Sequence, residues 1–331
     1  MKYRLLSCNV NNTVIILHNR LSAHPTPDEQ DVIDQVALVK DALENLGHRC
    51  LVRDVGSDLY SDLKPLVTEK PAFIFNLVES VWGCTGLLYM VPAILQAWKI
   101  PYTGVGEEGL YLTTKKTLAK TIMTRNGIET PGWVGTHEPD RLDIKKKYIV
   151  KPIAEEGSAN LDEHHVFDPK QPGMREWLAT FDPRQYFVEE YIEGREFNLS
   201  VTGTPGRYEI YPVPEMIFTD YPHGKAKILG YRSKWMEDSF EYKHTHRKFN
   251  TLNDSPLIIE KLRKSAITCG EVFGLSGYFR VDIRLSEQDI PYVLEVNANP
   301  CISPDSGFVA AGKEAGFSTS GMIQQIISCL N

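Results

Sequence analysis

The residues best suited to chemistry lie in one stretch near the C-terminus, residues 278–300. Its first part alternates polar and apolar side chains, which places Arg280 and Asp282 on the same face of a predicted strand. After a polar turn the chain returns as a second strand, on which Glu295 and Asn297 share a face. Two carboxylates and an amide oxygen suit a hard cation such as Mg²⁺, and Arg280 adds a fixed positive charge.

A surface hairpin with solvated charges explains this pattern about as well, because Asp, Glu and Arg side chains are mostly exposed in folded proteins. The pattern therefore leaves both interpretations open. The rest of the chain, which would have to position this hairpin, helps to decide between a metal site and a solvated surface.

The composition is that of a globular protein of two or three domains: 331 residues, 42% hydrophobic and 24% charged. A net charge of -7 without a basic block disfavours nucleic-acid binding. The six cysteines form no CxxC pair and the histidines lack zinc-ligand spacing, which favours reduced thiols and a cytoplasmic protein without structural zinc. We find no targeting segment and no apolar run near the roughly 20 residues of a membrane span.

The first hundred residues alternate predicted strands and helices. Residues 13–18, 48–55 and 72–76 read as strands, and residues 31–46 and 58–69 as helices. This order predicts a parallel α/β sheet, whose ligands bind beyond the carboxyl ends of the strands. The loops after His18 and Asn76 are therefore candidate site segments, although each of their residues is slightly more favoured as a simple connection.

The middle of the chain supplies lysines and a small-residue loop. Residues 112–126 predict one basic helix on which Lys116 and Lys120 share a face, and such lysines usually form a solvated face. A strand with Lys151 precedes the loop 155–160, which contains Gly157 and Ser158. Short Gly/Ser loops can present N–H groups to phosphate, but this one matches neither a Walker nor a dinucleotide motif.

Two glutamates, Glu189 and Glu196, flank a turn between predicted strands. The segment 212–247 has no regular pattern, but its aromatic residues argue against disorder and favour a functional loop. Residues 257–273 predict an amphipathic helix, and two shorter helices follow the hairpin.

Taken in order, these features resemble the ATP-grasp fold, and within it the D-alanine–D-alanine ligase family. The resemblance rests on Lys116, Lys151-Pro with Gly157-Ser158, Glu189 and Glu196, Lys234-Trp235, Arg280-Val-Asp282 and Glu295-Val-Asn297. It is strongest over roughly the last 60 residues. It implies an α/β fold of three parts: a Rossmann-like parallel-sheet domain in 1–111, a central ATP-grasp subdomain in 112–190, and a C-terminal subdomain with metal site and lid loop in 191–331.

The resemblance also implies which residues contact ATP: Lys116, Lys151, Gly157, Ser158, Glu189, Glu190, Glu196 and Lys234. The lysines would contact the phosphates, Lys234 from a lid formed by the long irregular segment, and the Gly-Ser loop would cover them. Glu189 and its neighbour would bind adenine, and Glu196 the ribose hydroxyls.

The resemblance also implies which residues bind the metal and which are catalytic. Two Mg²⁺ ions, or Mn²⁺ in their place, would be held by Asp282, Glu295 and Asn297, which lets the negative charges of ATP and an acyl phosphate approach one another. Arg280 would stabilise charge on the reacting acyl group, with Ser158 and the backbone N–H of Cys301 completing the catalytic set.

The departures from the family pattern fall on the amino-acid pockets. Asp28 or Glu29 would hold the donor's ammonium in an altered first loop, and Glu79 stands where the family has histidine. Trp235 replaces the tyrosine of the lid, and Ser306 would bind the acceptor's carboxylate. We therefore expect an ATP-dependent carboxylate–amine ligase for amino-acid-like substrates that need not be two D-alanines.

Three alternatives stay open at this point. The same chemistry could serve another acceptor, such as a peptide, a natural-product amine or a carrier-bound group. A non-catalytic nucleotide-binding protein is disfavoured by the joint presence of the lysines, arginine and acids. A thiol nucleophile at Cys84 or Cys301 is disfavoured because no histidine stands beside either. The family is often a homodimer, for which this sequence gives no signal of its own.

Overall fold

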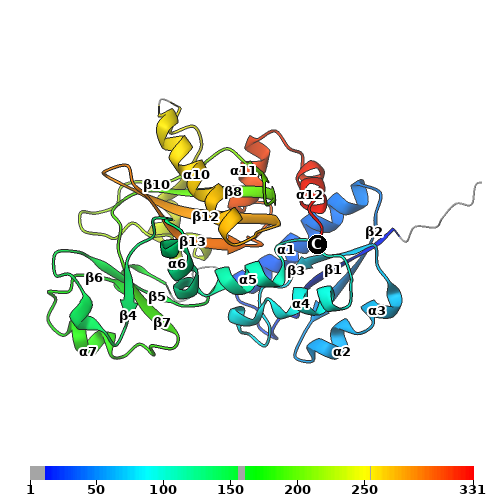
Figure 1. The fold of residues 1–331 in the computed structure, drawn as a ribbon, viewed down its shortest axis with the longest axis horizontal. Coiled ribbons are helices and arrows are strands. Elements are labelled where there is room, and N and C mark those ends of the chain that lie inside the picture. The colour runs from blue at the N-terminus through cyan, green and yellow to red at the C-terminus, as the bar shows by residue number, and fades with distance from the viewer. Residues whose placement is uncertain (1–11, 156–160, 254) are drawn as a thin grey trace, which may run out of the picture.

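The computed structural model describes residues 12–155, 161–253 and 255–331, and for Asp28 the backbone alone. One end of the molecule is built on a parallel sheet of order β2-β1-β3, with β1 (Thr13–Asn19), β2 (Arg49–Val55) and β3 (Phe73–Leu77) (Figure 1). Consecutive residues of β1 enter different cores, because strand side chains alternate between faces. Val14 and Ile16 pack on the side of helix α1 (Pro27–Asn45), and Ile15 and Leu17 pack on the opposite side.

The opposite side of this sheet is covered by α4 (Met90–Ala97) and two short helices, α2 (Leu59–Leu63) and α3 (Leu66–Glu69). The sequence predicted one helix over 58–69. The interruption falls at Pro65, which has no N–H to donate and disfavours helical geometry in the residue before it.

A second prediction of a single helix, over 112–126, was also wrong. The chain forms α5 (Glu107–Thr114) and α6 (Lys116–Arg125), separated by Lys115 in extended geometry. The break turns Lys116 toward the neighbouring strand, whose following residue, Ile153, accepts a 2.8 Å hydrogen bond from the Lys116 N–H. The helical periodicity of residues 112–126 did not indicate the break at Lys115.

The central part is a four-stranded antiparallel sheet of order β4-β7-β5-β6, with one short helix, α7 (Met174–Leu178), beside it (Figure 1). Its strands are β4 (Trp133–Gly135), β5 (Tyr148–Pro152), β6 (Val166–Phe167) and β7 (Tyr186–Glu190). Three 3-10 turns connect elements here and in the first part: η1 (Thr85–Leu87), η2 (Pro139–Arg141) and η3 (Glu163–His165).

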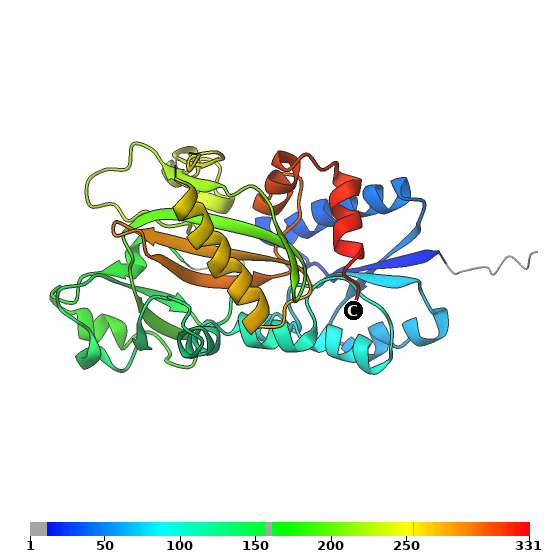
Figure 2. The same ribbon diagram turned by 45° about the horizontal axis from the view of Figure 1, so that its top comes forward.

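The largest sheet is antiparallel, with order β11-β10-β8-β12-β13 and β9 paired to β8. Its strands are β8 (Gly194–Thr204), β9 (Arg207–Ile210), β10 (Glu215–Phe218), β11 (Thr245–Lys248), β12 (Gly277–Ser286) and β13 (Pro291–Ala298). The long helix α10 (Pro256–Val272) crosses one face of this sheet (Figure 2). The predicted hairpin is confirmed as β12–β13, with Arg280 opposite Asn297 and Asp282 opposite Glu295.

The segment 212–247 is more ordered than the sequence suggested. It contains β10, the start of β11 and the short helices α8 (Tyr231–Trp235) and α9 (Phe240–Lys243). Residues 219–244, which we call the lid, connect the two strands and extend toward the central sheet. Its aromatic side chains pack on one another, with Tyr221 against Phe218 and Phe240, which explains why this stretch folds without a regular pattern.

The last two helices, α11 (Gly307–Glu314) and α12 (Thr319–Ile327), pack against the first part of the chain. Phe308 and Ile326 share one core with Val14 and Val36. Each sheet thus lies within one predicted range, but the C-terminal helices complete the first domain. Among the described residues, no helix is long and apolar enough to cross a lipid bilayer.

Candidate active site

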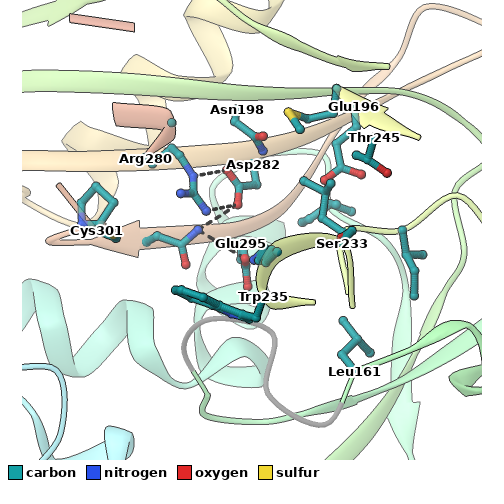
Figure 3. A pocket seen from close by; sticks show the side chains of 18 of the residues that line it. Leu161, Glu196, Asn198, Ser233, Trp235, Thr245, Arg280, Asp282, Glu295 and Cys301 are labelled. Carbon is teal, nitrogen blue, oxygen red and sulfur yellow. Dashed lines mark hydrogen bonds and ion pairs between the residues drawn. The ribbon is translucent and has the colours of Figure 1, made fainter. Parts of the chain in front are cut away.

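A cavity of about 970 Å³ lies between the central and large sheets, the lid and the loop after β13 (Figure 3). Most of the predicted site residues line it: Lys116, Lys151, Glu189, Glu190, Glu196, Lys234, Trp235, Arg280, Asp282, Glu295, Asn297, Cys301 and Ser306. Glu29 and Glu79 are not among the lining residues. Gly157 and Ser158 lie outside the residues that the structure describes.

The hairpin brings its four polar residues into direct contact. Arg280 donates two hydrogen bonds to Asp282, from Nε to Oδ1 at 2.7 Å and from an Nη to Oδ2 at 2.8 Å. The amide of Asn297 donates to Asp282 Oδ2 at 2.9 Å and to Glu295 Oε1 at 3.3 Å (Figure 3). Asp282 is 5% exposed, so this face is no solvated surface. The structure favours the site interpretation of the hairpin.

Glu295 is held in its ionised form by the cations around it. Burial alone would raise the pKa of this carboxyl group, but Lys116 and then Lys151, Lys234 and Arg280 hold the pKa well below its usual range. The closest of them, Lys116 Nζ, is 3.3 Å from Glu295 Oε2. Two of these cations also pair with other acids, Arg280 with Asp282 and Lys151 with Glu189. All four cations line the cavity, where they can contact a ligand with several negative charges.

The oxygen donors of the hairpin fit a hard divalent cation. Asp282 and Glu295 supply carboxylates and Asn297 can supply an amide oxygen, which is the chemistry of Mg²⁺ sites, where phosphates and water complete the shell. The amide nitrogen now faces the carboxylates, so Asn297 would have to turn to offer its oxygen. Within the described ranges no group of three or more His, Cys, Asp or Glu side chains forms a metal site, which gives no support to zinc-type ligation.

Lys116 and Lys120 are buried, contrary to the expectation of a solvated face. Lys116 is 8% exposed and Lys120 is fully covered. Lys120 Nζ lies 2.7 Å from Glu189 Oε2 and 2.8 Å from Thr130 Oγ1. Lys151 Nζ approaches the other oxygen of Glu189 at 2.5 Å. Helical spacing placed both lysines on one face correctly, but the covering sheets determined what that face contacts.

The carboxylate of Glu189 therefore bridges two lysines. Burial raises its pKa, but Lys120 and Lys151 outweigh this effect and hold the pKa below the usual value. Burial lowers the pKa of Lys120, because a charged amine loses hydration there. The neighbouring Glu190 pairs with Lys146 near the surface, at 2.7 Å. Glu189 thus fixes the position of Lys151 at the cavity wall.

Glu196 has a partner that the sequence reasoning missed. Arg284 Nε lies 2.8 Å from Glu196 Oε2, and both residues are less than 5% exposed. Arg284 also donates to the backbone carbonyls of Ile192 and Lys227, which joins the turn after β7 to the lid. Arg284 could have been identified as a site residue from the alternation of β12, because it lies on the same face as Arg280 and Asp282.

The substrate end of the cavity, near the loop after β13, contains an acid from α1. Asp31 Oδ2 accepts a hydrogen bond from the thiol of Cys301 at 2.9 Å. Gln35, 2% exposed, donates to Glu79 at 3.0 Å and accepts from the N–H of Ile302 at 3.1 Å. Glu79 therefore contacts Gln35 and is not among the residues that line the cavity.

Glu29, proposed for the donor's ammonium, is engaged at the start of α1. Its carboxylate accepts from Ser22 Oγ at 2.6 Å and from the Thr26 N–H at 3.3 Å. Such contacts stabilise the first turn of a helix. Asp31, two residues further, lines the cavity instead and is the stronger candidate for that role.

The surroundings of the Cys301 thiol disfavour the thiolate that a nucleophile would need. Burial and the adjacent Asp31 carboxylate raise its pKa well above the usual value, because both disfavour a thiolate. The side chain also contacts Ser303 Oγ at 3.2 Å. Cys301 therefore holds the loop after β13 in place.

Two more residues lie at the substrate end of the cavity and come from different elements. Ser306 caps α11, its hydroxyl accepting from the Val309 N–H at 3.3 Å. Arg247 of β11 lines the cavity nearby and donates to the backbone carbonyl of Asp305 at 3.3 Å. The sequence reasoning passed over Arg247, because it lay within the segment expected to be irregular.

The lid is fastened to the central part across the cavity. Lys225 pairs with Glu163 of η3 and, at 2.7 Å, with Glu241 of α9. The Tyr231 N–H donates to the Leu161 carbonyl at 2.9 Å. Trp235, at the end of α8, lies beneath the hairpin carboxylates (Figure 3). The lid therefore forms one wall of the cavity.

Comparisons with known proteins identify the family to which this fold belongs. The family model "D-ala D-ala ligase C-terminus" matches residues 147–328. An uncharacterized protein, y4sG, of Sinorhizobium fredii is 29% identical over 86% of this chain and 84% of its own length. The D-alanine–D-alanine ligase of Maridesulfovibrio salexigens is 27% identical over 94% and 97%. The crystal structure of the D-alanine–D-alanine ligase of Bacillus anthracis complexed with ATP superposes with a TM-score of 0.71 at 20% identity, covering 96% of each chain.

The fold and the cation-lined cavity with its acidic hairpin define the class as an ATP-grasp ligase, an enzyme that uses ATP to form carbon–nitrogen bonds. The chain belongs to the D-alanine–D-alanine ligase family, since the family model covers more than half of its length. Enzymes of this family use ATP and a divalent metal ion and act on small amino-acid substrates.

Proposed function

We propose that this enzyme phosphorylates the carboxylate of one amino acid with ATP and joins the resulting acyl phosphate to the amine of a second substrate. One observation carries the proposal: the Glu295 and Asp282 carboxylates lie opposite each other on the hairpin, with Lys116 3.3 Å from Glu295 and Arg280 2.7 Å from Asp282. Phosphoryl transfer needs this arrangement, because several negative charges must approach one another in a restricted space.

The nucleotide would occupy the end of the cavity nearest the central sheet. Lys116, Lys151 and Lys234 would contact its phosphates. The backbone of β7 and the following turn would bind the adenine, close to Glu189. Both contacts of Arg284 with Glu196 are made to Oε2, so Oε1 is available to a ribose hydroxyl.

Asp282, Glu295 and Asn297 would hold the divalent metal, which we propose to be two Mg²⁺ ions. When bound, the metal would neutralise phosphate charge during transfer. Arg280, oriented by Asp282, would face the acyl group and stabilise the negative charge that develops on its oxygen when the amine attacks. The backbone N–H of Cys301 would support the same oxygen. Lid residues such as Trp235 would exclude water, which would otherwise hydrolyse the acyl phosphate.

The substrates are amino acids, of which D-alanine is the first to test, because relatives such as the Maridesulfovibrio salexigens enzyme carry the name D-alanine–D-alanine ligase. Asp31, linked through Gln35 to Glu79, would hold the donor's ammonium. A non-D-alanine acceptor is the second candidate, favoured by the altered residues at this end.

A phosphate-release screen with Mg·ATP tests the proposal. Purified enzyme should release ADP and phosphate only with a suitable donor and acceptor, and mass spectrometry should show a product joined with loss of water. D- and L-alanine and other amino acids, peptides and simple amines form the panel. Absence of Mg·ATP binding under all conditions would overturn the proposal, and efficient formation of D-alanyl-D-alanine would exclude the second candidate.

The contact between lid and central part gives a prediction about ATP. Lys225→Met removes the ion pairs to Glu163 and Glu241, so the lid should close less completely over the nucleotide. We expect the KM for ATP to rise about tenfold, consistent with loss of a half-buried charge-assisted contact. Initial rates at varied ATP measure this. Lys227→Met, an exposed lysine of the same segment, should leave the KM unchanged; equal behaviour of the two variants would contradict the prediction.

A further inference from the structure

Arg247 differs from the other arginines of the cavity in its surroundings. Arg280 is paired with Asp282 and Arg284 with Glu196, in each case through direct contacts with the carboxylate. Among the described residues no carboxylate forms an ion pair with Arg247, which donates a hydrogen bond to the backbone carbonyl of Asp305 at 3.3 Å. Its guanidinium is therefore a cavity-facing cation without a direct acidic partner.

The place of this guanidinium is electrostatically unfavourable for a cation. A Cβ added to Gly307 would lie 3.5 Å from an Nη of Arg247, so the side chain rests against the first residue of α11. The N-terminus of a helix is positive, and a second cation there is destabilised. Burial, together with the nearby Arg280, lowers the pKa of Arg247, and Asp305 offsets only part of this. An anion bound between Arg247, Arg280 and the N-terminus of α11 would reduce the repulsion among these positive groups.

The contacts also indicate which end of the cavity the anion occupies. The phosphate-binding lysines gather at Glu295, and Lys116 donates to the Glu155 carbonyl. Arg247 instead contacts Asp305 and Gly307, which follow the loop of Cys301. It therefore faces the acceptor rather than the nucleotide.

The number of charges at this end favours an acceptor with two acidic groups. Ser306 and the N–H groups that begin α11 can receive one carboxylate. An amino acid with an uncharged side chain has no net charge and offers Arg247 no second carboxylate, so that only Asp305 offsets part of the positive charge there. One with an acidic side chain carries a net charge of -1, and the planar guanidinium matches its second carboxylate.

On this basis, and resting on the proposed ligase function, we propose that Arg247 makes the enzyme selective for an acceptor that is an amino dicarboxylic acid, by binding its side-chain carboxylate. The Arg247 guanidinium would donate to that carboxylate while the α-amine attacks the acyl phosphate. The C–N bond forms as the C–O bond to phosphate breaks, phosphate leaves with the electron pair, and the amine loses one proton.

The test compares isosteric acceptors. Aspartate and asparagine, and glutamate and glutamine, are supplied as both enantiomers with D-alanine as donor and Mg·ATP. The native enzyme should prefer the acids, and Arg247→Gln should lower kcat/KM for the acids about 30-fold while changing it less than threefold for the amides, since a charge-assisted hydrogen bond is lost only with the acids. Arg247→Lys should recover part of the loss. Arg207→Gln, on the exposed edge strand β9, is the matched control and should behave as the native enzyme.

Calorimetry separates this inference from the proposed function. Aspartate and asparagine are titrated into the enzyme with Mg²⁺, D-alanine and a non-hydrolysable ATP analogue, so no turnover is required. Aspartate binding that Arg247→Gln weakens selectively supports the inference, and if no acceptor then gives product, only the proposed function fails. Equal loss for aspartate and asparagine would overturn the inference, because Arg247 would then bind the α-carboxylate. So would the absence of any effect.

Discussion

Replacement of Glu295 by glutamine is expected to lower turnover about 10³-fold, because a neutral amide holds a divalent metal more weakly than a carboxylate and does not balance the cations around it. Asp282→Asn should have a similar effect, since it also removes the bidentate contacts that orient Arg280. ADP release at saturating ATP and varied Mg²⁺ measures both, and the Mg²⁺ concentration for half-maximal rate should rise in each variant.

Glu287→Gln provides the matched control for these substitutions. It makes the same chemical change in the same hairpin, but in the exposed turn between β12 and β13. The control should retain the native rate. Retention of more than a tenth of the native turnover by Glu295→Gln would mean that the hairpin is not the metal site.

Lys120→Met should give the largest loss of stability. Lys120 and Glu189 are 0% and 1% exposed, and their oxygen–nitrogen distance is 2.7 Å. Removing one member of a buried pair leaves the other charge poorly compensated, which costs about 3 kcal/mol. Lys151 still contacts Glu189, so the loss should stay at the lower end of the usual range. A fall in melting temperature of about 6 °C or more, measured by scanning calorimetry, is the expected result.

An exposed ion pair with the same nitrogen–oxygen distance shows how much of the loss of stability is due to burial rather than to the pairing itself. Lys146 and Glu190 are also 2.7 Å apart, but their side chains are 45% and 25% exposed. Water screens such a pair, and Lys146→Met should cost less than about 1 kcal/mol. If both variants melt alike, the burial of Lys120 contributes nothing particular to stability.

The alternation of residues 278–298 was sufficient to predict the hairpin and the face that its polar residues share. Strand geometry explains this success, because side chains alternate with a period of two whatever surrounds the strand. Helix periodicity was equally reliable for the shared face of Lys116 and Lys120. It failed for the break at Lys115, where a contact with Ile153, distant in sequence, redirects the chain.

Strand and helix periodicity could not predict which side chains pair with the charged residues. Arg284 and Glu196 are 88 positions apart, and Asp31 and Cys301 are 270 apart. Local sequence does not encode which distant side chain will face a given charge. For the same reason Glu29, rather than Asp31, was the residue predicted for the substrate's ammonium.

By itself the sequence determined the elements, the order of the phosphate- and metal-binding residues, and the resemblance to the ATP-grasp ligases. Those features depend on periodicity and on residue types along the chain. The tertiary structure alone decided that Lys120 is buried, that Glu295 has four cations around it, and that Arg247 lines the cavity beside Asp305. These depend on how three sheets and a lid are packed, because burial and charge are properties of the assembled cavity rather than of any one segment.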